Sequence, residues 1–211
     1  MQIAIIGAGN VGGALAGAAV KAGHTVSLAA TDADKVQQVA EATGAAAAPS
    51  AADAVRGAEL VILAVPHPAV ADLATELGDA LRGKVVVDST NPLNATFTDL
   101  STTGRSAAEE LQDLLPGSPV VKAFNTIFAS RHGNPVEGAH PLDSFIAGDD
   151  ADAKGKVVSL SESLGYRAID AGGLRMARSL EEMAFLNISL NAGNGWAWQS
   201  GWKLVGPTSA Q

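Results

Sequence analysis

The chain has 211 residues, 47% of them hydrophobic and 17% charged, which is enough apolar material for a large core at single-domain length. A formal net charge of −8 and the lack of any Lys/Arg-rich run exclude a typical nucleic-acid-binding protein. Cysteine is absent, which excludes thiolate nucleophiles, disulfides and zinc–thiolate sites and agrees with a reducing compartment.

The first segment is a short apolar run that ends in glycine. Residues 3–6 are all apolar, and no basic stretch precedes them. A run this short, without basic residues before it, is typical of neither a signal peptide nor a membrane span. We therefore expect a buried first strand in a cytoplasmic protein with no membrane partner.

Short β-rich runs then alternate with segments of helical composition along the chain. This rhythm is typical of βαβ units, whose right-handed crossovers lay helices on both faces of a parallel sheet. We predict an α/β, doubly wound, mainly parallel Rossmann fold with a short C-terminal helical extension, one domain over 1–205 and a frayed tail over 206–211. The expected strands are 3–6, 25–29, 60–65, 85–88, 120–123, 145–147 and 167–170, and the expected helices are 11–22, 33–43, 69–81, 107–115, 151–164 and 178–191.

A glycine-rich motif, Gly7-Ala8-Gly9-Asn10-Val11-Gly12, joins the first strand directly to an alanine-rich helix. That context is the one in which Gly-x-Gly-x-x-Gly predicts dinucleotide binding. Gly7 makes the tight turn, Gly9 lets the backbone approach the pyrophosphate, and Gly12 lets the helix pack against the strand. The helix N-terminus then faces the phosphates with free N–H groups. Asn10 is also interpreted as a helix N-cap, which is compatible with phosphate contact.

The end of the second strand bears on the choice between NAD and NADP. Asp32 lies twenty positions after Gly12, where an acidic residue accepts the ribose hydroxyls of NAD. Thr31 and Lys35 are instead suited to a 2′-phosphate, and Asp32 is equally well placed to cap the next helix. The sequence therefore leaves NAD possible beside NADP.

Three later strands end in loops with small, polar or proline residues: 64–68, 89–92 and 124–127. Ligands of open parallel sheets bind at these carboxyl ends, so the loops are candidates for holding the nicotinamide ribose and carboxamide. The prolines are equally explained as strand terminators. We expect the polar stretch 91–105 to be an ordered loop beside the site.

Several kinds of catalytic group are missing from the sequence. The one tyrosine, Tyr166, is followed by Asp170 at the offset where a short-chain dehydrogenase has its lysine. The four histidines have no metal-ligand spacing, and His67, on a strand-end loop, is the most plausible of them for catalysis. We therefore assign no catalytic side chain and no metal site, and we predict direct hydride transfer between two rings held face to face.

Three tryptophans crowd into the last sixteen residues, after an apolar helical segment. A helix that is apolar around much of its circumference must be covered, which favours a core or subunit interface and a homodimer. The alternative interpretation is a wall for a flat aromatic ligand. The residues are Trp196, Trp198 and Trp202.

Across essentially its whole length the chain resembles the deazaflavin-dependent NADP reductases, small Rossmann proteins that pass hydride between NADP(H) and coenzyme F-420. The likeness rests on the Gly-x-Gly-Asn-x-Gly start and on the segments 64–66, 104–109, 121–127, 148–150 and 170–172, in this order and spacing. It implies that the second substrate, a deazaflavin, stacks beside Val65 and Pro66. The implied dinucleotide-binding residues are Gly7, Gly9, Asn10, Val11, Gly12, Thr31, Asp32, Lys35, Ala64, Val65, Pro66, Asn125, Thr126, Ile127 and Ala129, of which the last four surround the nicotinamide.

The chain departs from this family at two places. The family usually has an arginine near the positions of Ala30 and Thr31, and the loop after Ser89 has a different sequence here. The leading hypothesis is an oxidoreductase that moves hydride between NADP(H) and a deazaflavin or flavin-like acceptor. The alternatives are an NAD(P)H-dependent reductase of another small unsaturated compound, such as an imine or carbonyl, and a non-catalytic NAD(P)-sensing protein.

Overall fold

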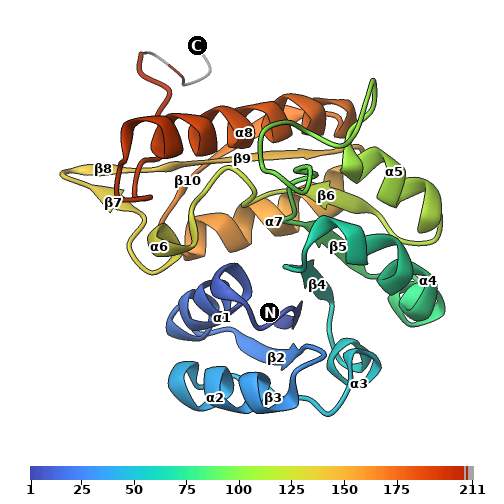
Figure 1. Cartoon of the computed structure of the whole chain (residues 1–211). Helices are drawn as coiled ribbons and strands as arrows, with labels where there is room; N and C mark the ends of the chain where they lie inside the picture. The colour runs from blue at the N-terminus through green and yellow to red at the C-terminus, as the bar shows by residue number, and fades with distance from the viewer. Residues whose placement is uncertain (207, 209–211) are drawn as a thin grey trace.

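The computed structural model describes residues 1–206 and 208, and its centre is an eight-stranded sheet in the order β10-β9-β6-β5-β4-β1-β2-β3 (Figure 1). The predicted doubly wound, mainly parallel Rossmann fold is thus confirmed, with β1 and β4 adjacent at the sheet centre. The strands are β1 (Gln2–Ile6), β2 (Thr25–Ala29), β3 (Ala46–Ala47), β4 (Leu60–Leu63), β5 (Val85–Asp88), β6 (Val120–Lys122), β9 (Asp143–Gly148) and β10 (Arg167–Gly172). A separate hairpin pairs β7 (Val136–Glu137) with β8 (His140–Pro141).

Helices cover both faces of the sheet because successive strand residues point to opposite sides. Ile3 and Ile5 of β1 belong to one core cluster, with α1, α2 and α7, while Ala4 and Ile6 belong to a second, with α3, α4, α5 and α8. All four side chains are buried, so residues 3–6 of β1 form a continuous apolar run, as a strand covered on both faces requires. The helices are α1 (Asn10–Lys21), α2 (Ala33–Thr43), α3 (Ala51–Arg56), α4 (Val70–Leu81), α5 (Ala107–Leu114), α6 (Ala129–His132), α7 (Ala151–Ser163) and α8 (Ala177–Asn194), with 3₁₀ turns η1 (His67–Ala69) and η2 (Leu174–Met176).

One pair of neighbouring strands in the sheet is antiparallel. β9 pairs antiparallel with β6, placing Lys122 opposite Ala147. The chain between these strands holds only the one-turn helix α6 and the β7–β8 hairpin. Without a long crossover helix, the chain re-enters the sheet from the edge where β6 ended, and the antiparallel direction follows.

Several short elements were not predicted, among them β3 and α3. The alanine run 45–48 contributes β3, which pairs with Ser27 and Leu28 at the edge of the sheet. Directly after it, Ser50 caps α3 by accepting a hydrogen bond from the backbone N–H of Asp53. The frayed tail predicted over 206–211 falls largely outside the described residues.

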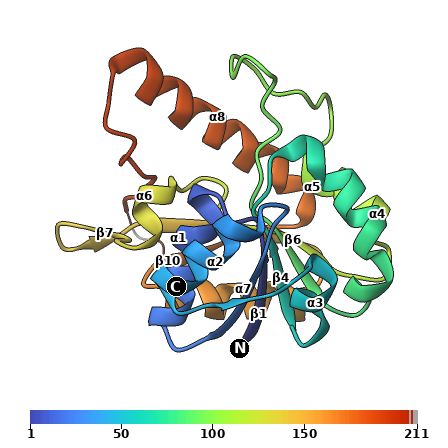
Figure 2. The ribbon, with the colours of Figure 1, turned by 60° about the horizontal axis from the view of Figure 1, so that its bottom comes forward.

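The long loop after β5 and the C-terminal helix α8 both rise above the edge at which the parallel strands end (Figure 2). The loop is ordered, as predicted: Leu93 and Leu100 bridge its two arms, and Asn94 Oδ1 accepts from the backbone N–H of Thr98 at 3.0 Å. Within the described residues, no helix has the length and apolarity needed to cross a membrane. Ligands of open parallel sheets bind at the carboxyl edge, which the loop after β5 and α8 overhang here.

Candidate functional site

The glycine loop between β1 and α1 is built for close backbone packing at two positions and left open at a third. Gly7 has a φ of +122°, and a Cβ there would overlap the carbonyl group of Ala64. A Cβ on Gly12 would overlap the carbonyl of Gly7, whereas nothing lies within 4 Å of a Cβ on Gly9. Gly7 and Gly12 thus have the close backbone packing that the fingerprint predicts, and Gly9 faces open space on the surface of the loop.

The N-terminus of α1 is available to an anion. Gly9 is the N-cap, with no side-chain capping bond, so the interpretation of Asn10 as the cap is wrong. Asn10 is the first helical residue, and its side chain is exposed. The N–H groups of the first turn therefore keep the donors and the positive dipole end that bind phosphate.

A cavity of about 650 Å³ lies on one side of this loop. Its lining includes residues that the sequence did not indicate: Ser50 and Ala51 at the start of α3, a helix that was not predicted, and Asp72, Leu73 and Glu76 on the predicted helix α4. The predicted site residues in its lining are Gly7, Gly9, Thr31, Asp32, Lys35, Ala64, Val65 and Pro66.

Asp32 caps α2 and also lines this cavity. Its Oδ1 accepts a hydrogen bond from the backbone N–H of Lys35 at 2.9 Å, so the capping interpretation is confirmed. The ammonium group of Lys35 donates to Gln38 Oε1 at 3.1 Å. The carboxylates of Asp72 and Glu76 line the same cavity, which gives its rim an excess of negative charge.

A second cavity, of about 180 Å³, holds the other group of predicted residues. Every residue that lines it is uncharged. One wall of this cavity is formed by α8, through Ala184, Asn187 and Ile188. No pattern in the sequence had connected this helix to the site. The remaining lining residues are Val11, Ser89, Asn91, Phe124, Asn125, Thr126, Ile127, Phe128 and Ala129, whereas Asn10 and Gly12 line neither cavity.

The tryptophans line neither cavity. The ring of Trp198 packs edge-on against Phe128, with centroids 5.4 Å apart. Its carbonyl accepts from the Ser130 hydroxyl at 2.6 Å. Trp198 therefore packs against the start of α6, and the tryptophans do not form a wall for a flat ligand at either cavity.

The loop after β6 is held in an unusual conformation beside the smaller cavity. Phe124 is buried with a φ of +65°, a region that bulky residues rarely adopt. The rings of His132 and Tyr166 contact it with centroids 6.1 and 6.4 Å away. Strained backbone of this kind is typical of functional sites.

Two asparagines join the loops after β5 and β6. Asn125 Nδ2 donates to Asn91 Oδ1 at 2.9 Å and to the carbonyl of Leu180 at 3.0 Å. Asn91 Nδ2 donates in return to the carbonyl of Asn125 at 2.9 Å. Asn125 Oδ1 is buried but has no hydrogen-bond partner among the described residues. An acceptor left unpaired in this way favours a ligand that donates a hydrogen bond.

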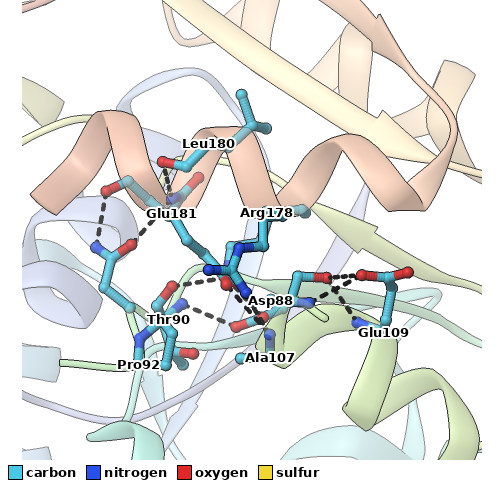
Figure 3. A network of polar contacts seen from close by, with 12 residues as sticks. Asp88, Thr90, Pro92, Ala107, Glu109, Arg178, Leu180 and Glu181 are labelled. Carbon is cyan, nitrogen blue, oxygen red and sulfur yellow. Dashed lines mark hydrogen bonds and ion pairs between the residues drawn. The ribbon is translucent and has the colours of Figure 1, made fainter. Parts of the chain in front are cut away.

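A fully buried ion cluster lies under the same loops (Figure 3). Lys122 Nζ, at the end of β6, contacts Asp88 Oδ2 at 2.8 Å and Glu181 Oε1 at 2.9 Å. Burial alone would lower the pKa of Lys122, but the two carboxylates outweigh it and raise the pKa. Burial raises the pKa of Glu181 more than Lys122 lowers it. The ammonium group is thus firmly charged and joins β5, β6 and α8.

His67 and His132 are not placed for proton transfer at the cavities. Neither lines a cavity, and burial lowers the pKa of both, that of His132 to about 3. His132 Nδ1 lies 2.9 Å from the Tyr166 hydroxyl, in the aromatic cluster behind Phe124. Among the described residues there is no group of three or more potential metal ligands.

Comparisons with known proteins show the family to which the chain is similar. Residues 2–92, which include the glycine loop and the end of β4, match the family described as NADP oxidoreductase, coenzyme F420-dependent. The F420-dependent NADP reductase of Methanothermobacter marburgensis is 33% identical over 92% of this chain and 94% of its own length.

Solved structures show the same fold. A putative F420-dependent NADP reductase from an Arthrobacter species superposes with a TM-score of 0.87 at 31% identity, covering 97% of this chain and 100% of that one. An imine reductase from Myxococcus stipitatus, at 19% identity over 92% of this chain and 63% of its own, has a TM-score of 0.73 and supports the fold alone. The chain therefore belongs to the F420-dependent NADP oxidoreductase family, a family of NAD(P)-dependent oxidoreductases.

Proposed function

We propose that this protein binds NADP(H) across the carboxyl edge of its sheet and passes a hydride between the nicotinamide and a deazaflavin or flavin-like acceptor. The observation that carries the proposal is the position of the glycine loop between the two cavities. Gly9 lines the larger cavity and Val11, two residues later, lines the smaller one. A pyrophosphate at the N-terminus of α1 would therefore join an adenosine in the first to a nicotinamide in the second.

The chain's own residues would bind and orient the cofactor and exclude water from it. Thr31, Asp32 and Lys35 line the adenosine side, where the ribose and its 2′ substituent would lie. Asn125, Thr126 and Ile127 line the nicotinamide side, and the apolar side chains there keep water from the ring. When bound, the cofactor supplies a hydride from its nicotinamide ring.

The uncharged lining of the smaller cavity supports direct transfer between two rings. A hydride step needs the two reacting carbons close and aligned, and positioning alone contributes several orders of magnitude to rate. The names of the full-length relatives, F420-dependent NADP reductases, support a deazaflavin as the acceptor.

The experiment is stopped-flow mixing of the NADPH complex with a deazaflavin, a flavin, and an imine or carbonyl compound. We expect nicotinamide absorbance and deazaflavin absorbance to fall together, with equal rate constants, and the other acceptors to react at least tenfold more slowly. A faster reaction with the imine or carbonyl compound would assign the chain to another reductase class. Tight NADPH binding without oxidation by any acceptor would indicate a sensing protein.

A further inference from the structure

Three walls of the smaller cavity are the loop after β5, the loop after β6 and the helix α8. Each of these walls adjoins one member of the buried ion cluster. Asp88 is the last residue of β5, directly before Ser89 of the lining, and Lys122 is the last residue of β6, two residues before Phe124. Glu181 lies on α8, one turn before Ala184. The cluster is thus the point at which the walls are joined.

Glu181 is the member that connects α8 to the rest. Its Oε1 accepts from Lys122 Nζ at 2.9 Å and from the backbone N–H of Ala107 at 3.1 Å, so it ties α8 to β6 and to the start of α5. Lys122 Nζ reaches further, to the carbonyl of Thr90 at 2.8 Å, in the loop that carries Asn91. Figure 3 labels Glu181, Ala107 and Thr90 of this network.

Leu180, the residue before Glu181, holds the side chain of Asn125, which lines the smaller cavity. The carbonyl of Leu180 accepts from Asn125 Nδ2, and Asn91 Oδ1 accepts from the same nitrogen. Because both neighbours of this nitrogen are acceptors, the amide orientation of Asn125 is fixed. Its Oδ1 is then the end left without a partner among the described residues, in a side chain that lines the cavity.

We propose that Glu181 is a positioning residue, which through Lys122 and the Leu180 carbonyl holds Asn125 so that its Oδ1 accepts an N–H of the nicotinamide carboxamide. The inference rests on the proposed function, since it requires the nicotinamide to enter the smaller cavity. The carboxamide NH₂ is the one donor on the nicotinamide ring, and a buried amide oxygen without a partner is the acceptor that it requires.

The first test uses a cofactor analogue that lacks this donor. In the 3-acetylpyridine analogue of NADP⁺, a methyl group replaces the carboxamide NH₂. We expect the protein to bind NADP⁺ about tenfold more tightly than the analogue, which is the effect of one neutral hydrogen bond with its buried partner. Asn125→Ala should bind the two ligands within about twofold of each other, since it offers no acceptor.

The second test separates Glu181 from Asn125. Glu181→Leu leaves a balanced Lys122–Asp88 pair but cuts the link to α8, so we expect the preference for NADP⁺ over the analogue to fall below about threefold. Glu181→Gln keeps an acceptor for both Lys122 Nζ and the Ala107 N–H and should restore the preference of the native protein. Glu181→Met provides the same comparison if the leucine variant does not fold.

The matched control is Asp143→Asn. Asp143 is also a fully buried carboxylate held by two cations, Arg167 and Lys203, but it lines neither cavity. This variant should lower the melting temperature and leave the preference for NADP⁺ unchanged. Affinity for 2′-phospho-ADP-ribose, which has no nicotinamide, should stay within about twofold in every variant, because the larger cavity is intact.

Equal affinity of the native protein for NADP⁺ and the analogue would overturn the proposal. So would a Glu181→Leu or Glu181→Met variant that keeps the full preference, or a Glu181→Gln variant that loses it. Failure of the native protein to bind either dinucleotide would instead contradict the proposed function.

Discussion

At the residue scale, Gly9 is the position where a side chain would compete directly with the cofactor. Its φ of −75° is open to any residue, and no atom lies within 4 Å of an added Cβ. We expect Gly9→Val to fold with a free energy of unfolding within about 1 kcal/mol of the native value and to lose NADP(H) binding by at least about a hundredfold, as measured by calorimetry.

Gly57→Val is the matched control for this substitution, since Gly57 is also exposed, has a φ of −96°, and has nothing near an added Cβ. It lines neither cavity and should bind the cofactor normally. Unchanged affinity in Gly9→Val would show that the glycine loop does not hold the pyrophosphate.

Asp32 combines two roles at one position, a helix cap and a charge at the adenosine side. Asp32→Asn keeps a capping oxygen but removes the charge that repels a 2′-phosphate, so we expect the ratio of NADP⁺ to NAD⁺ affinity to rise about tenfold. Asp150→Asn alters the equivalent cap of α7 away from both cavities and should leave the ratio unchanged. A ratio that does not move in Asp32→Asn would assign Asp32 to capping alone.

At the scale of elements, α6 and the strained Phe124 depend on a histidine that stays neutral. Burial lowers the pKa of His132 from 6.5 to about 3, so below pH 6.5 the unfolded chain binds a proton that the folded protein does not. Stability contributed by His132 is therefore present above pH 6.5 and is lost as the pH falls toward 3. Between pH 6.5 and 5 the loss amounts to roughly 2 kcal/mol.

Urea unfolding of the native protein and of His132→Gln at both pH values checks this. Gln retains a donor for the Tyr166 hydroxyl but does not titrate, so it should remove the His132 part of the acid sensitivity. Identical pH dependence in the two proteins would show that His132 is not buried in its neutral form.

The elements differ in how far the sequence predicted them. β1, β4 and β5 consist mainly of buried isoleucine, valine and leucine, and this pattern was sufficient to predict them. The alanine run that forms β3 has no periodicity, and α3 is only six residues long, so neither gave a signal. The antiparallel entry of β9 depends on where the chain turns after β6, which no local propensity encodes.

The candidate site was likewise predicted from the sequence only in part. The glycine loop is a local motif and was predicted from spacing, while the loop after β6 was predicted from its place at a strand end and from the family resemblance. The wall formed by α8 was not predicted, because the contact between Lys122 and Glu181 joins residues 59 apart in the chain. A buried ion pair across such a distance leaves no periodic trace in the sequence.

At the scale of the whole molecule, the segment after α8 packs back onto the fold and, together with α8, exposes apolar side chains. Trp198 packs on Phe128, and the Trp202 carbonyl accepts from the backbone N–H of Asp143 at 3.1 Å. Several large apolar side chains near it are exposed by 37% or more: Leu186, Leu190, Trp196, Trp198, Leu204 and Val205. Because exposed apolar side chains favour association, the homodimer stays a prediction that this surface allows to be tested.

A chain truncated after Gly195 tests both roles. We expect it to melt at least about 5 °C lower, because Phe128 and the polar contacts of Asn191 lose their cover. We also expect light scattering to report a dimer for the full chain and a different oligomeric state for the truncated chain. A truncated chain with the native melting temperature, oligomeric state and NADP(H) affinity would contradict both roles.

The central claim, direct hydride transfer between two rings at the carboxyl edge of the sheet, is tested most directly by an isotope. The measurement is single-turnover reduction of a deazaflavin by NADPH carrying deuterium at C4 of the nicotinamide, followed by mass analysis of the product. We predict that the deuterium appears on the acceptor ring and that the reaction is slowed, while His67→Ala changes the rate by less than about tenfold. Deuterium lost to solvent, or a thousandfold slower reaction in His67→Ala, would contradict direct transfer and indicate an obligatory proton-transfer group.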